Sequence, residues 1–370
     1  MLATCILTGV ILLAYANGAN DNFKGTATLW GSGTLNYTKA LRLATVATVA
    51  GALVSVLFAT TLVKNFSGKG LVPDALAQSP VFLLSVALGA GLTVLLATRF
   101  GFPISTTHGL VGALVGGGFA GAAQSVNLSL LGKTFFLPLI LSPVVAVIAS
   151  LSVYLIFKRI RNFSKIEKES CVCIVNEMPL LSQSNPAIAL SDSTKIVAST
   201  EGCNEIYTGK MVGINAQTLL DGLHYVSAGT VCFARALNDA PKMAGLLLAV
   251  AFFTPSVNII ILAAAMAIGG ILQARKVAET MSRNITPMNH GQGFSANLVT
   301  GVLVILASTK GLPVSTTHVS VGSLIGIGLV NGKADYSQIG KILLSWVLTL
   351  PIAAVLSGLF YIIFSNLIKI

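Results

Sequence analysis

Long apolar stretches, separated by short polar connections, run along most of the chain. Ten of them can be counted, at residues 2–18, 39–63, 79–98, 103–125, 134–157, 212–250, 257–274, 294–309, 313–331 and 340–366. About 20 apolar residues in a helix span the hydrocarbon core of a bilayer. The pattern therefore predicts an all-α polytopic membrane protein with roughly 10–12 membrane segments. Glycine-rich, short stretches such as 103–125 indicate broken or re-entrant helices.

A polar segment at residues 158–210 divides these stretches into two groups of five. Directly after an apolar stretch it opens with five basic residues, Lys158, Arg159, Arg161, Lys165 and Lys168. Lys and Arg next to a membrane span favour the cytoplasmic side. We therefore predict an N-terminal membrane repeat at 1–157, a cytoplasmic linker loop at 158–210, and a C-terminal membrane repeat at 211–370. The N-terminus is then expected outside the plasma or inner membrane.

Composition and charge agree with this interpretation. Hydrophobic residues make up 54% of the 370 residues, only 9% are charged, and the mean hydropathy is +0.84. A soluble domain carries about a quarter charged residues, so the composition argues against a cytosolic enzyme. The net charge of +11 comes without a basic stripe interleaved with aromatic residues. The lipid bilayer, and not a nucleic acid, is therefore the predicted partner.

Two motifs occur once in each half of the chain. Gly101-Phe-Pro-Ile-Ser-Thr-Thr-His108 recurs as Gly311-Leu-Pro-Val-Ser-Thr-Thr-His318, and eleven of eighteen positions are identical over 101–118 and 311–328. Upstream of each copy, Asn20-Asp21-Asn22-Phe23-Lys24 matches Asn238-Asp239-Ala240-Pro241-Lys242. Five apolar stretches per half, an odd number, predict an inverted second half. Inverted repeats are typical of secondary transporters, whose substrate site lies at the midplane between the halves.

The repeated Pro-x-Ser-Thr-Thr-His segment brings hydroxyl groups to the expected start of a helix. Proline suits the first helical turn or the loop before it. The residues that follow would offer hydroxyls and free backbone N–H groups, and such a helix terminus binds anions. Two copies would surround a tetrahedral oxyanion with Ser105, Thr106, Thr107, Ser315, Thr316 and Thr317. The alternative interpretation is helix capping by these side chains.

The same segments end in His108 and His318, two of the four histidines in the chain. A histidine at this place can orient the loop through a hydrogen bond, or it can titrate. We predict the orienting role for both.

The Asn-Asp motifs place acidic side chains within or beside apolar stretches. A carboxylate there is costly unless it is paired or binds an ion, so Asp21 and Asp239 are candidate functional residues. Asn20 and Asn238 add amide oxygens, which are hard ligands suited to Na⁺. The alternative interpretation is a structural ion pair at i,i+3 spacing, formed with the lysines at 24 and 242.

The acids also distinguish between oxyanions. Phosphate near pH 7 keeps one or two protons and donates hydrogen bonds to carboxylates, whereas sulfate keeps none and is repelled. The site therefore favours phosphate. Import against a negative interior costs about 2.3 kcal/mol per charge per 100 mV. Uptake therefore needs a co-transported cation or another energy source, and the chain has no P-loop to supply ATP hydrolysis.

These residues resemble the inorganic phosphate transporter (PiT) family of cation-coupled phosphate symporters. The resemblance rests on Gly18-Ala-Asn-Asp21 followed by Gly31-Ser-Gly33, on both Ser-Thr-Thr-His loops, and on Asn238-Asp239. Arg275–Thr280 and Gly293–Ala296 are similar to a further stretch of the family, and only 158–210 is left uncovered. The resemblance implies an inverted-repeat fold, Na⁺- or H⁺-coupled phosphate uptake without another cofactor, and a homodimer. It implies phosphate binding by Asp21, Ser105, Thr106, Thr107, Asp239, Ser315, Thr316 and Thr317, with Na⁺ near Asn20 and Asn238.

One departure from the family falls at the last position of each motif. Many relatives carry Asn-Asp-Val-Ala-Asn, and here Lys24 and Lys242 replace the final Asn. An ammonium has the charge of a bound Na⁺ and removes an oxygen ligand. We therefore predict that one or both sodium sites are altered, which would allow H⁺ coupling. The alternative is that each lysine snorkels to the membrane interface.

Three other functions are compatible with the pattern. A carrier for sulfate or arsenate is the nearest one. An intramembrane hydrolase would use Ser, His and Asp, but a catalytic nucleophile and base normally occur once, not in two symmetric copies. A channel is the third. We predict a transporter and not an enzyme.

Overall fold

The computed structural model describes residues 2–58, 60–122, 125–164, 166–170, 205–211, 213–248 and 253–367. Each of the ten apolar stretches corresponds to one long helix, so the prediction of a helical polytopic protein is confirmed. Seven helices in the described part are long and apolar enough to cross a membrane. The ten long helices are α1 (Leu2–Asp21), α3 (Tyr37–Phe58), α6 (Pro80–Arg99), α7 (Thr106–Ala122), α9 (Leu137–Phe163), α10 (Ala216–Ala244), α11 (Pro255–Gln273), α13 (His290–Thr309), α14 (Thr316–Asn331) and α15 (Tyr336–Leu367).

Short elements connect the long helices. The helical ones are α2 (Ala27–Gly31), α4 (Thr60–Asn65), α5 (Asp74–Ala77), α8 (Leu128–Leu130) and α12 (Arg275–Glu279), with π-helical turns at Leu131–Phe136 and Thr280–Asn284 and a 3₁₀ turn at Gly245–Leu247. Two small antiparallel sheets pair β1 (Glu167–Ser170) with β2 (Glu205–Thr208), and β3 (Lys210–Met211) with β4 (Ile214–Asn215). The helix α9 continues to Phe163, past the predicted repeat boundary at 157. Most of the predicted linker, 171–204, lies outside the described residues.

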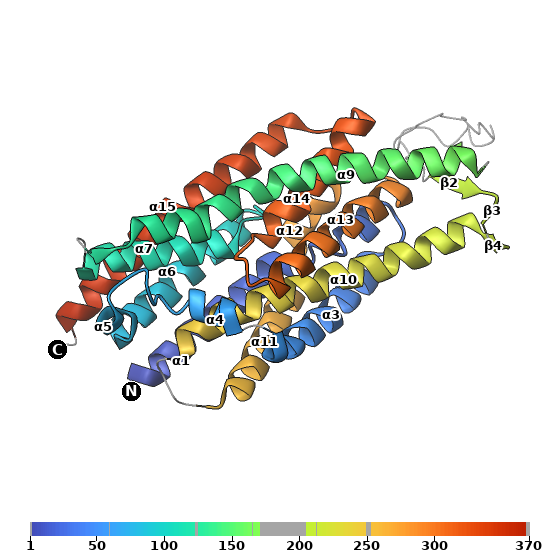
Figure 1. The fold of residues 1–370 in the computed structure, drawn as a ribbon. Coiled ribbons are helices and arrows are strands. Elements are labelled where there is room, and N and C mark those ends of the chain that lie inside the picture. Colours follow the sequence, from blue (N-terminus) through green and yellow to red (C-terminus); the bar gives the residue numbers. More distant parts are fainter. Residues whose placement is uncertain are drawn as a thin grey trace, which may run out of the picture.

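The long helices form an elongated bundle, with both chain termini toward one end and β2, β3 and β4 at the other (Figure 1). The helix α1 runs away from the end that holds the termini, whereas α10 runs toward it (Figure 1). The same opposition holds between α9 and α15 (Figure 1). In chain order, α10 and α15 are the counterparts of α1 and α9 in the second half. In these two pairs, the corresponding helices therefore point in opposite directions.

Helix packing is reciprocal between the halves. The helix α1 packs on α6 of its own half and on α11 of the other. Its counterpart α10 packs on α13 of its own half and on α3 of the other. Likewise α7 packs on α15, and α14 packs on α9. Exchanging the two halves maps each of these helix pairs onto another pair, so the fold interleaves two related units and does not set two separate domains side by side.

Repeated glycines make the closest of these helix contacts possible. A Cβ at Gly116 in α7 would lie 1.9 Å from the carbonyl oxygen of Ala354 in α15. In the corresponding pair, a Cβ at Gly326 in α14 would lie 2.5 Å from the carbonyl oxygen of Val147 in α9. Small residues let helix backbones approach closely in membranes. The glycine spacing of both halves is therefore used for packing within one chain.

Replacing Gly116 with Ala is expected to destabilise the protein by about 1–3 kcal/mol, because the new methyl group overpacks the α7–α15 contact. The midpoint of thermal unfolding in detergent measures the effect. Gly222→Ala in α10 is the matched control, since a Cβ there meets nothing within 4 Å. Equal midpoints for the two variants would show that α7 and α15 are less closely packed than described.

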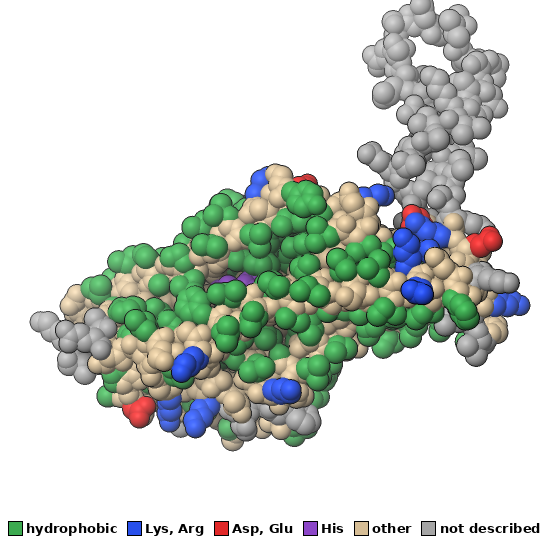
Figure 2. Space-filling model, turned by 45° about the horizontal axis from the view of Figure 1, so that its top comes forward, with side chains coloured by type: hydrophobic (Ala, Val, Ile, Leu, Met, Phe, Trp, Pro, Cys, Tyr) green, Lys and Arg blue, Asp and Glu red, His purple; other side chains and the backbone are tan. Residues whose placement is uncertain are grey.

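Hydrophobic side chains cover much of the face of the bundle that Figure 2 shows. The helices α9 and α15 carry exposed Leu, Ile and Val side chains, among them Leu137, Ile140, Val144, Ile148, Leu344, Val347, Val355 and Ile362. Exposed apolar side chains of this kind are suited to contact with lipid. The polar side chains that the sequence singles out lie on the inside, where the two halves meet.

Candidate functional site

A glycine at the end of α6 directs the chain into the first Ser-Thr-Thr-His loop. Gly101 has a φ of 75°, the left-handed conformation that favours glycine. The N–H of Phe102 donates to the carbonyl of Ala97 at 3.0 Å, and the N–H of Gly101 donates to the carbonyl of Thr98 at 3.0 Å. This pair of bonds is a Schellman motif, which ends a helix and reverses the chain. The loop then enters α7 at Thr106.

The second half repeats this loop at the end of α13. Gly311 has a φ of 65°. The N–H of Leu312 donates to Ala307 at 2.9 Å, and the N–H of Gly311 donates to Ser308 at 3.1 Å. The repeated glycine thus produces the same reversal before α14.

The two serines of the loops are helix caps. The Oγ atoms of Ser105 and Ser315 accept hydrogen bonds from the backbone N–H of His108 and His318, each at 3.1 Å. The capping interpretation is therefore confirmed for the serines. The hydroxyls of the next residues remain for other contacts. All eight residues predicted to hold phosphate are buried, namely Asp21, Ser105, Thr106, Thr107, Asp239, Ser315, Thr316 and Thr317.

The first turns of α7 and α14 meet through their histidines. The ring centroids of His108 and His318 lie 4.6 Å apart. His318 also stacks on Trp346 of α15, with centroids 3.9 Å apart, and its Nδ1 lies 3.1 Å from the carbonyl oxygen of Leu139. The indole of Trp346 donates to the carbonyl of Pro103 at 2.9 Å. These contacts position the loops, and the functional role of the histidines stays a prediction.

The two Asn-Asp motifs lie at helix C-termini. Asp21 is the last residue of α1, and Asp239 lies shortly before the end of α10. Each acid forms an ion pair with the lysine three residues later, Lys24 or Lys242. Both lysine side chains are buried, each with an exposed fraction of 1%. The snorkelling interpretation is therefore wrong, because these ammonium groups stay inside, near helix C-termini whose dipoles favour positive charge.

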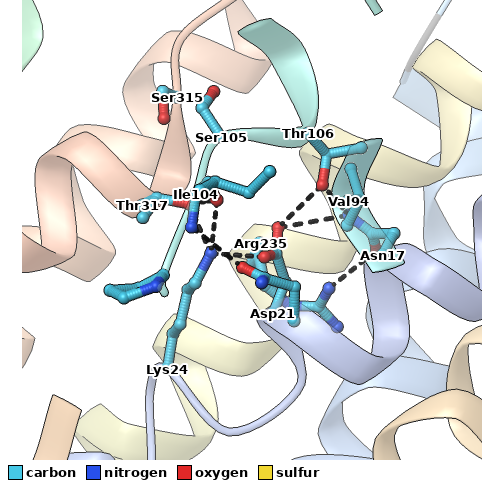
Figure 3. A network of polar contacts seen from close by, with 12 residues as sticks. Asn17, Asp21, Lys24, Val94, Ile104, Ser105, Thr106, Arg235, Ser315 and Thr317 are labelled. Atoms are coloured by element: carbon cyan, nitrogen blue, oxygen red, sulfur yellow. Dashed lines mark hydrogen bonds and ion pairs between the residues drawn. The ribbon is translucent and has the colours of Figure 1, made fainter. Parts of the chain in front are cut away.

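Each lysine also donates a hydrogen bond to a threonine in the other half of the chain. The Nζ of Lys242 donates to the Oγ1 of Thr107 at 2.7 Å. The Nζ of Lys24 donates likewise to Thr317 (Figure 3). In this way the acid-bearing end of each helix from one half is linked to the hydroxyl-rich helix start of the other half.

The structure adds a residue that the motifs did not reveal, Asn17 of α1. Its Nδ2 lies 3.2 Å from the Oδ2 of Asp21 and 3.3 Å from the Oδ2 of Asp239. The same Nδ2 lies 3.0 Å from the Oγ1 of Thr106, which itself donates to Asp21 at 3.3 Å (Figure 3). Asn17 thus contacts acids from both halves.

A second unexpected residue is Arg235 of α10, whose side chain is 1% exposed. Its guanidinium donates to the Oδ1 of Asn17 at 3.0 Å and to the Oγ1 of Thr48 at 2.8 Å. It also lies 3.9 Å from a carboxylate oxygen of Asp239. We refer below to the polar cluster, which consists of Asn17, Asp21, Lys24, Thr106, Thr107, Arg235, Asp239, Lys242 and Thr317.

The cluster carries an excess of positive charge. Among the described residues, five Asp, Lys and Arg side chains are buried, and all five belong to it. Three are cations and two are carboxylates, which gives a formal net charge of +1. Burial of an excess cation is costly unless it is compensated, so the cluster favours an anion as its ligand.

The two asparagines predicted to bind a cation differ from each other. The amide of Asn20 is fully engaged, since its Nδ2 donates to Thr98 and Phe102 and its Oδ1 accepts from Ile104 at 3.1 Å. Asn238 donates to Ser308 at 2.9 Å, but its Oδ1 is buried without a partner in the described part of the chain. Asn20 therefore positions the loop before α7, and the cation-binding role of both residues stays a prediction.

Fold and site together define a multi-pass helical membrane protein with a buried, charged site between two related halves. The chain belongs to the phosphate transporter family, whose model matches residues 17–357. It is thus a transporter and not an enzyme, and its family is the one that the sequence motifs indicated.

Known proteins of similar sequence and structure extend over nearly all of the chain. A protein of Pyrococcus furiosus is 29% identical over 98% of this chain and 97% of its own, and one of Chlamydia trachomatis is 26% identical over 98% of both. Both bear the name "Putative phosphate permease". A solved structure described as the sodium-dependent phosphate transporter matches with a TM-score of 0.77 at 22% identity, covering 99% of each chain. This match establishes a common fold.

Proposed function

We propose that the protein imports inorganic phosphate as a secondary symporter driven by a Na⁺ or H⁺ gradient. One observation carries the proposal: both copies of the two motifs meet in one buried cluster with a formal charge of +1. Helix N-termini and hydroxyls supply hydrogen-bond donors to an oxyanion. The two acids accept hydrogen bonds from phosphate, which keeps protons near pH 7. The proposed ligands are Asp21, Ser105, Thr106, Thr107, Asp239, Ser315, Thr316 and Thr317.

Transport at this site requires access from alternate sides. The opposite directions of α1 and α10, and the reciprocal packing of the halves, support an inverted repeat. Because the cluster is buried between the halves, a rocking motion of one half against the other would open it to each side in turn. The cytoplasmic side of 158–210, the outside N-terminus and the homodimer remain predictions of the sequence.

Radiolabelled phosphate uptake into proteoliposomes tests the function directly. An inward Na⁺ gradient, an inward H⁺ gradient and no gradient are compared, with excess unlabelled sulfate as the competitor. We expect accumulation with at least one gradient and no effect of sulfate. A lack of accumulation under every condition would contradict phosphate symport. Full competition by sulfate would favour a general carrier of tetrahedral oxyanions.

Replacing Thr106 with Val is expected to weaken phosphate binding about 10-fold. The substitution removes a hydroxyl that is a proposed phosphate ligand and that donates to the charged carboxylate of Asp21. Equilibrium binding of labelled phosphate to the purified protein measures the change. Thr8→Val is the matched control, since Thr8 is exposed on the same α1 helix that carries Asp21. Unchanged affinity in Thr106→Val would place the phosphate elsewhere.

A further inference from the structure

The ammonium of Lys24 lies in a cage of three oxygen atoms. They are a carboxylate oxygen of Asp21, the hydroxyl of Thr317 and the backbone carbonyl of Ile104, the last at 3.1 Å. The carbonyl comes from the loop that leads into α7, and the hydroxyl from the first turn of α14. The cage is therefore assembled from both halves of the chain (Figure 3).

The second half builds the same cage around Lys242. Its Nζ donates to Asp239 at 3.0 Å, to the carbonyl of Val314 at 3.0 Å and to Thr107 at 2.7 Å. The two hydroxyls in turn donate to these same carbonyls, since Thr107 contacts Val314 at 3.3 Å and the corresponding bond on the other side measures 2.7 Å. Two equivalent cages thus have the same types of ligand in the same positions.

The ligand set is one that a small dissolved cation would also use. Carboxylate, carbonyl and hydroxyl oxygens are hard ligands, and unwound backbone carbonyls hold the coupling ion in many transporters. An ammonium has one positive charge, three donors and no acceptor, so three oxygens satisfy it completely. Each cage is therefore filled by a cation that is covalently part of the chain.

The net charge of the polar cluster also argues against a dissolved Na⁺ in the cages. The cluster holds three buried cations against two carboxylates, a formal net charge of +1. A phosphate monoanion brings this charge to zero without any additional ion. A dissolved Na⁺ would leave the loaded, buried site positively charged, which is unfavourable.

We propose that the ammonium groups of Lys24 and Lys242 take the place of dissolved coupling cations, so that the protein binds and carries dihydrogen phosphate without dissolved Na⁺. This inference rests on the proposed phosphate transport. Uptake then depends on the supply of the protonated anion and is stimulated by an acidic outer solution. Because each ammonium takes ligands from both halves, it also makes the link between halves that a bound coupling ion would otherwise make.

The first test uses the unmodified protein in proteoliposomes. Phosphate uptake is measured at a fixed inward H⁺ gradient with Na⁺, K⁺ or choline as the external cation. We expect equal rates with the three cations. A saturable requirement for Na⁺ would overturn the inference while leaving phosphate transport intact, and would direct attention to the unpartnered Oδ1 of Asn238. Absence of uptake with any cation would instead refute the proposed function.

The second test empties both cages. In the Lys24→Asn plus Lys242→Asn protein, phosphate affinity in choline is expected to fall about 10- to 100-fold, and added Na⁺ to restore it in part. Lys64→Asn plus Lys310→Asn is the matched control, because it removes one exposed lysine from each half. An affinity in choline equal to that of the unmodified protein would overturn the inference. The first test decides the matter if the double variant does not fold.

Discussion

Arg235→Gln is expected to lower phosphate affinity about 100-fold or more, and with it to stop uptake at micromolar phosphate. Arg235 supplies the cation that makes the cluster positive, since the other four charged groups form two ion pairs. Without it, a phosphate monoanion would leave the buried site with a net negative charge. Glutamine keeps a donor for Asn17 and much of the volume, so the effect reports mainly the charge.

Equilibrium phosphate binding and thermal unfolding are measured on the same purified protein. Arg275→Gln is the matched control, because its side chain is 75% exposed and pairs with Glu279 at the surface. Arg235→Lys separates charge from geometry: it keeps the charge but loses the fork that reaches both Asn17 and Thr48. We expect an intermediate loss of affinity for it. Wild-type affinity in Arg235→Gln would show that the excess charge does not attract the substrate.

The repeated motifs did not reveal Arg235, because the equivalent position in the other half carries a different residue. Arg235 and Asn17 are 218 positions apart, which is also the spacing between the Asn-Asp motifs. They are therefore equivalent positions of the two halves. A search for repeats finds positions that stayed the same, and this pair has diverged to an arginine and an asparagine that bind each other.

One signal in the sequence does point to Arg235. It lies inside the apolar stretch 212–250, and an ionisable side chain within a membrane segment is a functional candidate whatever its sign. We applied that rule only to Asp21 and Asp239, which are two of the five buried charged groups among the described residues. The other three are Arg235 and the two lysines.

The long helices were predictable because the apolar stretches are long, with ends that differ by up to six residues, as at α9 and α10. The helix ends were harder to predict where the adjoining loop is itself apolar. The apolar stretch 103–125 predicts a start at Pro103, but α7 begins at Thr106. Residues 102–105 are apolar or small, so hydropathy does not distinguish this loop from a helix, and the left-handed Gly101 that sets it is a backbone feature.

The partners of the lysines could not be derived from spacing alone. The i,i+3 ion pairs follow from helical geometry, and both form. The remaining oxygens come from Ile104, Val314 and two threonines that lie far away in the sequence. Only the crossing of the two halves brings them to the ammonium groups, which decides against the snorkelling interpretation.

Asp239→Asn is expected to convert a phosphate-selective site into one that also binds sulfate. In the unmodified cluster a sulfate dianion leaves a net charge of −1 and offers no proton to the carboxylates. With one acid neutralised, the empty cluster has a charge of +2, which a sulfate dianion balances. The new amide can also donate a hydrogen bond to a sulfate oxygen. We expect sulfate affinity to rise about 10- to 100-fold relative to phosphate.

Competition of unlabelled sulfate against labelled phosphate measures this shift, and Asp74→Asn at an exposed position of α5 is the matched control. Asp21→Asn should give the same shift, since Asp21 is the counterpart of Asp239 in the other half. A shift in sulfate competition in only one of the two variants would mean that the substrate contacts mainly one half of the site. If sulfate competes no better in either variant than in the unmodified protein, the carboxylates do not select the anion, and the inferred role of the protons of the substrate is wrong.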